Sequence, residues 1–194
     1  MNKTTVFALT MLASGIANAE NITLPAPETT GGKPLMQAMA ERKTAREFSD
    51  KPVSAKDLSN ILWAAYGFNR PDKRTIPTAR NEQGMDVYAL LPDGAFLYNA
   101  KDNVLEQVSK QDLRALLGPQ DFAHKAPLTL LFVEKQHRYA GVHAGSAYQN
   151  VGLYCASAGL NNVVRGLVDF DGLAKALNLG DKEVIITQTI GYPV

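Results

Sequence analysis

The chain has few of the residues that usually build a covalent or metal-based site. Cys155 is the single cysteine among 194 residues, so no disulfide can form within the chain. It lies in the apolar run Val151–Ala156, which favours a buried, unreactive side chain over a nucleophile. There are three histidines, and the nearest pair, His137 and His143, is six residues apart, which does not place both on one helical face. We therefore expect no structural metal.

An excess of charge of either sign is also lacking. The 20 Lys and Arg residues nearly balance the 19 Asp and Glu residues, and the formal net charge is +1. A dedicated nucleic-acid-binding protein usually carries a basic face, so we expect no nucleic-acid partner. The sequence contains no Walker A, G-x-S-x-G or H-E-x-x-H motif and no glycine-rich dinucleotide fingerprint. It offers no visible nucleophile or acid–base pair of its own.

The N-terminus has the three parts of a secretory signal. A short basic start, Met1–Lys3, precedes an apolar stretch, Val6–Ile16, and the A-x-A sequence Ala17–Ala19 follows. The apolar stretch is too short to span a bilayer. We expect residues 1–19 to be a cleaved signal peptide, which predicts a periplasmic or secreted protein with no membrane span after cleavage.

The rest of the chain predicts one α+β domain, residues 34–194, preceded by an extended N-terminal arm, residues 20–33, in which prolines and a Gly-Gly pair occur. Helices are expected at Pro34–Arg42, Ser54–Tyr66, Gln111–Leu117, Tyr139–Ala158 and Asp169–Leu177. Strands are expected at Met85–Leu91, Ala95–Tyr98, Val104–Val108, Leu128–Glu134 and Glu183–Ile190, and a short extended turn at Asn162–Gly166. This order predicts helices packed on a mostly antiparallel sheet.

A long polar segment, Phe68–Gln83, separates the second helix from the first strand. It shows no periodic pattern and carries four cations, Arg70, Lys73, Arg74 and Arg80. Irregular segments of this length in a compact domain are usually functional or disordered. We interpret it as a binding loop; a mobile surface loop is the alternative, and a basic module for an anionic envelope ligand is a third interpretation of the protein.

A second basic cluster occupies Arg42–Arg46. Three cations, Arg42, Lys43 and Arg46, lie with the hydroxyl of Thr44 within five residues. Arginine suits bidentate contacts to phosphate and lysine acts as a point charge, although cations are also ordinary at a helix C-terminus. Because no protein-borne chemistry is visible, these groups suit an anionic cofactor that carries out the reaction itself.

Four stretches together resemble the FMN-dependent nitroreductase-like family, over about Pro34–Pro193. They are Arg42–Arg46 with Phe48, similar to the signature R-x-S/T-x-R-x-F; Pro77–Asn81, similar to the P-S-x-x-N loop; Ala147–Leu160, similar to the long central helix; and Val164–Gly166 with Ile190–Pro193, similar to the strand beside the flavin and the closing G-Y-P. The hairpin at Asp93-Gly94 and the strand at Leu97-Tyr98 are more similar to the thiazoline/oxazoline-oxidase branch.

The resemblance implies a homodimer with two FMN sites at its interface. It assigns cofactor binding to Arg42, Thr44 and Arg46 at the phosphate and ribityl chain, with Lys43 adjacent; to Pro77, Thr78, Ala79, Arg80 and Asn81 from the partner side; and to the backbone of Val164, Arg165 and Gly166 near the flavin N5. The implied function is an exported oxidoreductase with ping-pong electron transfer through FMN to a small molecule. The alternative is a catalytically silent member that binds flavin, a ligand or a partner.

Two positions depart from the family pattern. Many members have a Lys or Arg beyond the closing G-Y-P that reaches the flavin phosphate, whereas Val194 follows Pro193 here. The cations of the long polar segment, Arg70, Arg74 and Arg80, are candidates to replace it. Arg165 stands where an acidic or small residue is common, and a cation there would favour the anionic reduced flavin. The substrate and the electron donor are not assigned by the sequence.

Overall fold

The computed structural model describes residues 20–194, so the expected signal peptide, residues 1–19, lies outside the described residues. Seven strands form one sheet in the order β1-β6-β5-β4-β7-β9-β8, and every pairing in it is antiparallel. The strands are β1 (Ile22–Thr23), β4 (Asp86–Leu91), β5 (Gly94–Asn99), β6 (Val104–Ser109), β7 (Leu128–Glu134), β8 (Asn161–Arg165) and β9 (Glu183–Gly191). The expected antiparallel sheet is confirmed.

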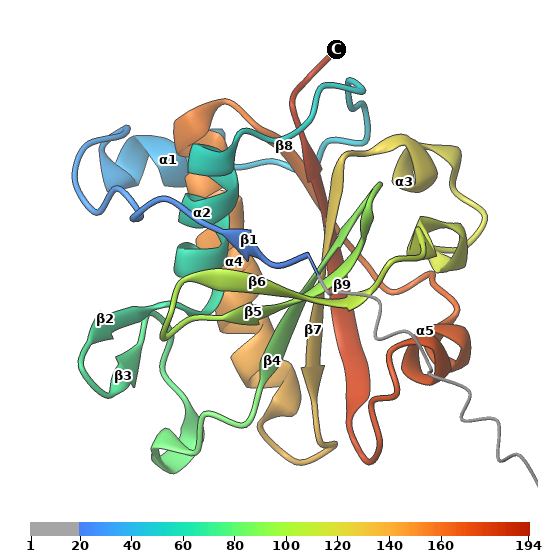
Figure 1. Cartoon of the computed structure of the whole chain (residues 1–194). Coiled ribbons are helices and arrows are strands. Elements are labelled where there is room, and N and C mark those ends of the chain that lie inside the picture. Colours follow the sequence, from blue (N-terminus) through green and yellow to red (C-terminus); the bar gives the residue numbers. More distant parts are fainter. Residues whose placement is uncertain (1–19) are drawn as a thin grey trace, which may run out of the picture.

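Helices cover both faces of this sheet. They are α1 (Leu35–Glu41), α2 (Ala55–Tyr66), α3 (Asp121–Lys125), α4 (Ala140–Ala158) and α5 (Phe170–Ala176), with two 3-10 turns, η1 (Ala79–Asn81) and η2 (Leu113–Leu116). Figure 1 shows α1, α2 and α4 on one side of the sheet and α3 and α5 on the other. Among residues 20–194, no helix is both long enough and apolar enough to cross a bilayer.

Strand β7 separates two apolar cores. Leu130 and Phe132 point into the core beneath α2 and α4, whereas Leu131 and Val133 point into the core beneath η2 and α5. This alternation follows from the two-residue period of a strand, and it favours apolar residues on both faces of a strand that is covered on both sides. All seven residues of β7 are buried, so the expected central strand is confirmed.

Local signals set the ends of the two main helices. Ser54 Oγ accepts a hydrogen bond from the Asp57 backbone N–H at 3.0 Å and so caps α2. Helix α4 ends at Gly159, whose φ of 74° is left-handed and favours glycine. Near this end Cys155 is fully buried, and burial raises the pKa of its thiol far above the ordinary value. The expectation of a buried, unreactive cysteine is confirmed.

The N-terminal arm lies on its own chain. Ile22 in β1 pairs with Leu105 in β6, and Leu24 is buried in the core beneath α2. Ser59 Oγ donates to the Pro25 carbonyl at 2.6 Å, and the Lys33 N–H donates to Ser157 Oγ at 2.8 Å. The arm therefore adds an edge strand to the sheet and then crosses α2 and α4.

The expectation of an irregular loop at Phe68–Gln83 is wrong. The segment forms a small hairpin, β2 (Phe68–Arg70) with β3 (Lys73–Arg74), followed by η1. The Arg74 guanidinium lies 4.1 Å from the Tyr66 ring centre and 4.0 Å from that of Phe68. It also donates to the Tyr66 carbonyl at 2.9 Å. The contacts of Arg74 with Tyr66 and Phe68 therefore hold the hairpin against the end of α2, although the segment has no apolar periodicity.

Candidate functional site

The basic segment Arg42–Arg46 lies beside β8. The Ala45 N–H donates to the Asn162 carbonyl at 3.0 Å, and Asn161 Nδ2 donates to the Glu47 carbonyl at 2.7 Å. Further along, the Ser49 N–H donates to the Tyr192 carbonyl at 2.9 Å. These contacts fix the segment along the outer edge of β8.

The side chains of this basic segment are open to solvent or only half-buried. Arg42 is half-buried, and its aliphatic stem lies next to Gly152 of α4, where a Cβ atom would meet its Cδ at 3.5 Å. Lys43, Thr44 and Arg46 are exposed. Within residues 20–194, none of these four side chains makes a hydrogen bond or an ion pair. Free guanidinium, ammonium and hydroxyl groups fit a phosphate monoester.

Strand β8 continues this surface along α4. Val164 is half-buried and pairs with Gln188 of β9, whose Nε2 donates to the Tyr148 carbonyl in α4 at 3.2 Å and to Asn162 Oδ1 at 3.0 Å. Gly166, just beyond β8, is exposed, and its backbone N–H has no backbone partner within the described part of the chain. Two of the predicted stretches, Arg42–Arg46 and Val164–Gly166, therefore share one edge of the sheet.

The guanidinium of Arg165 does not lie at the predicted cofactor edge, where a cation was expected. Its side chain is 5% exposed and points to the sheet face opposite α4. The guanidinium donates to the carbonyls of Leu117 at 2.7 Å and Leu167 at 3.1 Å and to Gln120 Oε1 at 2.9 Å. Burial lowers the pKa of this guanidinium from its ordinary value. These hydrogen bonds hold β8 against the η2–α3 segment. Only the backbone of Arg165 faces the predicted cofactor edge.

The loop Pro77–Asn81 lies at the other end of α4. The Ala79 N–H donates to His143 Nε2 at 2.9 Å, in the first turn of the helix. Gly152, beside Arg42, is nine residues further along α4, which is about 14 Å at 1.5 Å per residue. Within one chain the loop and the basic segment therefore lie at different positions along α4.

The loop is held in an unusual backbone conformation. Arg80 and Asn81 have φ angles of 53° and 59°, in the left-handed region. The Asn81 side chain accepts from Gln83 Nε2 at 2.9 Å and donates to the Asp72 carbonyl at 3.4 Å. Pro77 and Arg80 are exposed, and Thr78 and Ala79 are half-buried.

Most cations of the hairpin are not free to replace the missing C-terminal one. Besides its contacts to Tyr66, Arg74 donates to Gln83 Oε1 at 2.9 Å, and burial lowers its pKa. Lys73 forms an ion pair with Asp72 at 2.9 Å. Arg70 is exposed and donates only to the neighbouring Asn69 Oδ1 at 3.3 Å, so two of the four cations of Phe68–Gln83 are held by other groups and the interpretation as a basic binding module stays a prediction. Arg80 is exposed and has no hydrogen-bond or ion-pair partner among residues 20–194.

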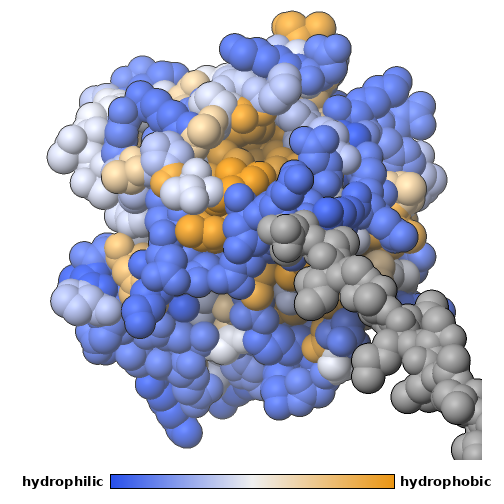
Figure 2. Space-filling view, in the orientation of Figure 1, coloured by the Kyte–Doolittle hydropathy of each residue, from blue (hydrophilic) through white to orange (hydrophobic). Residues whose placement is uncertain are grey.

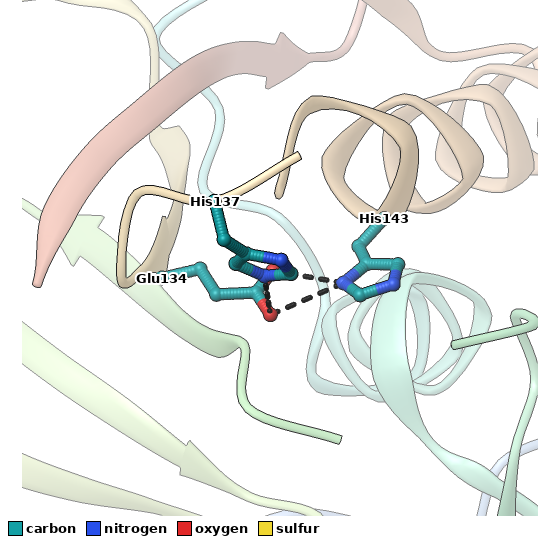
Figure 3. Close-up of side chains that lie close together, drawn as sticks. All are labelled: Glu134, His137 and His143. Carbon is teal, nitrogen blue, oxygen red and sulfur yellow. Dashed lines mark hydrogen bonds and ion pairs between the residues drawn. The ribbon is translucent and has the colours of Figure 1, made fainter. Parts of the chain in front are cut away.

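Sequence reasoning missed a buried polar cluster. Figure 3 shows Glu134, at the end of β7, between His137 of the following turn and His143 of α4. His137 Nε2 lies 2.9 Å from Glu134 Oε1, and His143 Nδ1 lies 3.1 and 3.0 Å from the two carboxylate oxygens. One ligand atom from each residue lies within 4.8 Å of the others, as a metal site would require. The spacing argument compared positions on one helix, whereas here a strand, a turn and a helix meet.

Two cavities lie away from these groups. The larger, about 680 Å³, is bounded by the arm, α1, α2 and α4, with Leu35, Trp63 and Leu153 in its lining. The smaller, about 280 Å³, lies near Val53, Leu58 and Leu91. Figure 2 shows apolar side chains gathered in a hollow in the upper half of the visible face. Neither cavity is lined by a residue of Arg42–Arg46, Pro77–Asn81 or Val164–Gly166.

Comparison with known proteins identifies the family. The model of the Nitroreductase family matches residues 39–192. The structure of a nitroreductase-like protein of Ralstonia eutropha JMP134 is 41% identical, with a TM-score of 0.83 and 90% of each chain covered. A nitroreductase-like protein of Methanocaldococcus jannaschii is 26% identical over 156 residues, which are 68% of this chain and 78% of that protein.

A more distant structure shares the fold. The FMN-dependent nitroreductase of Clostridium difficile R20291 is 15% identical, with a TM-score of 0.60, and the match covers 81% of this chain and 87% of that one. The family match, which spans most of the chain, and the close agreement of the Ralstonia structure confirm the family predicted from the sequence. The chain belongs to the nitroreductase family.

Proposed function

We propose that this protein is an exported, homodimeric, FMN-dependent oxidoreductase that transfers electrons to a small molecule. The observation that carries the proposal is the group of side chains at Arg42, Lys43, Thr44 and Arg46, which lies beside β8 and has no hydrogen-bond or ion-pair partner among residues 20–194. Membership of a family that includes an FMN-dependent enzyme supports the choice of cofactor. The hairpin β4–β5, with Asp93-Gly94 at its turn, supports the thiazoline/oxazoline-oxidase-like branch.

The basic segment would bind the phosphate end of the cofactor. Arg42 and Arg46 supply planar guanidinium donors for phosphate oxygens, and the Thr44 hydroxyl can donate to the phosphate or to the ribityl chain. Lys43 also lines a cavity of about 450 Å³ with Glu41, away from the other three side chains, so we assign it a smaller share of the binding. The net effect is to orient the cofactor along β8.

The far end of β8 would meet the redox-active ring. The Gly166 N–H, which has no backbone partner within residues 20–194, is placed to donate to a ring nitrogen. FMN, when bound, supplies reversible two-electron transfer, which would let a donor and an acceptor use one site in turn. The protein would position the flavin ring, place the Gly166 N–H as a hydrogen-bond donor at its edge and limit access by water.

The incomplete site within one chain supports a homodimer. The loop Pro77–Asn81 lies about 14 Å along α4 from the basic segment, and we propose that the loop of a partner chain completes the site, as the resemblance to the family implies. Helix α1 also exposes three large apolar side chains, Leu35 at 62%, Met36 at 75% and Met39 at 50%. Gathered on a seven-residue helix next to α4, such side chains are typical of a protein interface.

The expected signal peptide supports a periplasmic or secreted location. NAD(P)H is a cytoplasmic donor, so we propose that the flavin is reduced by another donor. In the alternative, the substrate itself reduces the flavin, and oxygen, as in an oxidase, accepts the electrons.

Stopped-flow measurements under anaerobic conditions test for a donor. The mature protein, saturated with FMN, would be mixed with candidate donors, and reduction of the flavin would be followed. Bound flavin that no donor reduces would favour the alternative, a catalytically silent flavin-binding member.

A titration of purified protein with FMN tests whether Arg42–Arg46 binds the phosphate of the cofactor. Each charge-assisted contact is worth about 1.5–3 kcal/mol, so Arg46→Ala should raise the dissociation constant by roughly tenfold to a hundredfold. Arg42→Ala should have a similar effect, and high salt should weaken wild-type binding. Lys101→Ala, which removes an exposed cation from the β5–β6 turn, is the matched control and should change nothing. Equal affinity in all variants would contradict the assignment.

A further inference from the structure

A buried histidine supports the backbone of the loop Pro77–Asn81. His143 is 1% exposed, and its Nε2 accepts the Ala79 N–H at 2.9 Å. Ala79 is the first residue of η1, and the preceding residue, Thr78, makes no capping hydrogen bond with its side chain. The N–H groups at the start of a helical turn need an acceptor from outside the turn. His143, 64 residues away, supplies the acceptor that a capping side chain usually provides.

The contact fixes which nitrogen of His143 carries a proton. A backbone N–H can only donate, so His143 Nε2 must present its lone pair to Ala79. The proton of the neutral ring therefore sits on Nδ1, which faces the Glu134 carboxylate at 3.1 and 3.0 Å (Figure 3). Glu134 is 3% exposed, and its carboxylate also accepts from His137 Nε2 at 2.9 Å. Glu134 thus selects the tautomer that can hold Ala79.

The same hydrogen bonds account for the cluster without a metal ion. His137 Nδ1 accepts the Tyr139 N–H at 3.3 Å, so both rings have one nitrogen that donates to Glu134 and one that accepts from the backbone. A cation bound at His143 Nδ1 would leave the ring proton on Nε2, where it would oppose the Ala79 N–H. Metal binding and the contact to Ala79 therefore exclude each other.

The loop needs support because its backbone is strained. Immediately after Ala79, Arg80 and Asn81 have φ angles of 53° and 59°, and Gln83 has 51°. A left-handed conformation costs a residue other than glycine about 1–2 kcal/mol, so three such residues together favour rearrangement unless other contacts oppose it. The hydrogen bond to His143 anchors the start of this stretch to α4.

We propose that Glu134 and His143 are positioning residues, which hold the Pro77–Asn81 loop in the conformation that receives the cofactor of the partner subunit. The inference rests on the proposed function for its link to FMN, but the contact to Ala79 can be tested without cofactor. Neither side chain touches the predicted cofactor edge, so both act through the loop backbone.

Two substitutions at His143 separate this role from general packing. His143→Leu fills a similar volume but removes the acceptor for Ala79. His143→Gln keeps an oxygen near the position of Nε2 and so can restore the contact. Glu134→Gln permits the other tautomer of His143, because an amide can donate to Nδ1, and should have an intermediate effect. Circular dichroism and urea unfolding would establish that each variant is folded.

The first measurement is hydrogen exchange of the Ala79 amide in the cofactor-free protein. We expect His143→Leu to speed exchange at Ala79 by tenfold or more, whereas core amides in β7 keep their rates and His143→Gln lies near the wild type. An unchanged Ala79 rate in His143→Leu would overturn the inference. So would stoichiometric Zn²⁺ binding that leaves the Ala79 amide protected, because it would contradict the tautomer assignment.

The second measurement is the FMN dissociation constant of the same variants. We expect roughly a tenfold increase in His143→Leu, the loss for one hydrogen bond that holds the loop, and partial or complete recovery in His143→Gln. Wild-type affinity in His143→Leu would overturn the role in cofactor binding. If the wild type binds no FMN, the proposed function fails, whereas the exchange data still decide whether His143 holds the loop.

Discussion

Replacement of Arg165 offers the sharpest test of the packing around β8. Its guanidinium donates to two main-chain carbonyls, those of Leu117 and Leu167, and to the side chain of Gln120. It also lies 5.2 Å from the centre of the Phe122 ring. Arg165→Met keeps most of the aliphatic stem but removes every donor. The buried Leu117 carbonyl is then left without its partner where water cannot easily replace it, whereas the contacts to Leu167 and Gln120 are only partly buried.

The expected loss follows from those acceptors. A buried group left without its hydrogen bond costs about 1–3 kcal/mol. With one buried carbonyl, one partly buried carbonyl and the contact to Phe122 affected, we expect Arg165→Met to lower the free energy of unfolding by about 2–4 kcal/mol. In a domain of this size, about 2–4 °C of melting temperature corresponds to 1 kcal/mol, so the melting point should fall by roughly 4–16 °C. Arg165→Lys should recover part of the loss by reaching one carbonyl.

Urea unfolding followed by circular dichroism measures this loss. The matched control is Lys135→Met, which removes a cation from an exposed ion pair with Asp181 and should change stability by less than about 1 kcal/mol. If Arg165→Met is no less stable than this control, the guanidinium does not hold the buried carbonyls. If Arg165→Met changes the FMN affinity strongly but leaves stability unchanged, the side chain of Arg165 acts in cofactor binding and not in packing.

Two further predictions concern other buried or bridging groups. Burial alone would raise the pKa of Asp57, but hydrogen bonds from Tyr154, Tyr192 and Ser54 outweigh burial, and the net effect is a lowered pKa. The carboxylate therefore stabilises the folded protein above its unfolded pKa of about 3.9. This stabilisation is lost as the pH falls through the lower pKa of the folded state. Asp57→Asn should therefore be less stable than the wild type in urea at pH 7, and the gap should narrow at pH 3; a constant gap would contradict the account. Cys155 is fully buried with a raised pKa, so a thiol reagent should label it in urea but not in the folded protein, and rapid labelling of folded protein would contradict its burial.

The sequence was most informative where an element contains its own pattern. Leu128–Glu134 is mostly apolar and is buried along its whole length, and Ser54 caps a helix as its spacing with Asp57 predicts. By contrast, β1, β2, β3 and α3 were missed. They are two to five residues long, too short for a period to show, and they depend on contacts with distant parts of the chain.

The candidate site was predicted only in part for a similar reason. Motif spacing correctly identified the family, but side-chain direction depends on which face of the sheet a residue occupies. Arg165 and Arg74 appear in the sequence as free cations, whereas the fold places both against carbonyls and aromatic rings. The contact between His143 and Ala79 joins residues 64 positions apart. A glutamate that ends an apolar strand, with a histidine three residues later, was the one local signal for that cluster.

The place of β9 in the sheet has a consequence for the order of events during folding. Strand β9 lies between β7 and β8 although it follows both in the chain. Strand β8 therefore lacks its neighbour in the sheet until Gly191 has been synthesised, and such non-local pairing is slow. The basic segment Arg42–Arg46 depends on β8 for its position, so the proposed phosphate site is among the last features to form. In an exported chain, cofactor loading would then have to follow both translocation and the closure of the sheet.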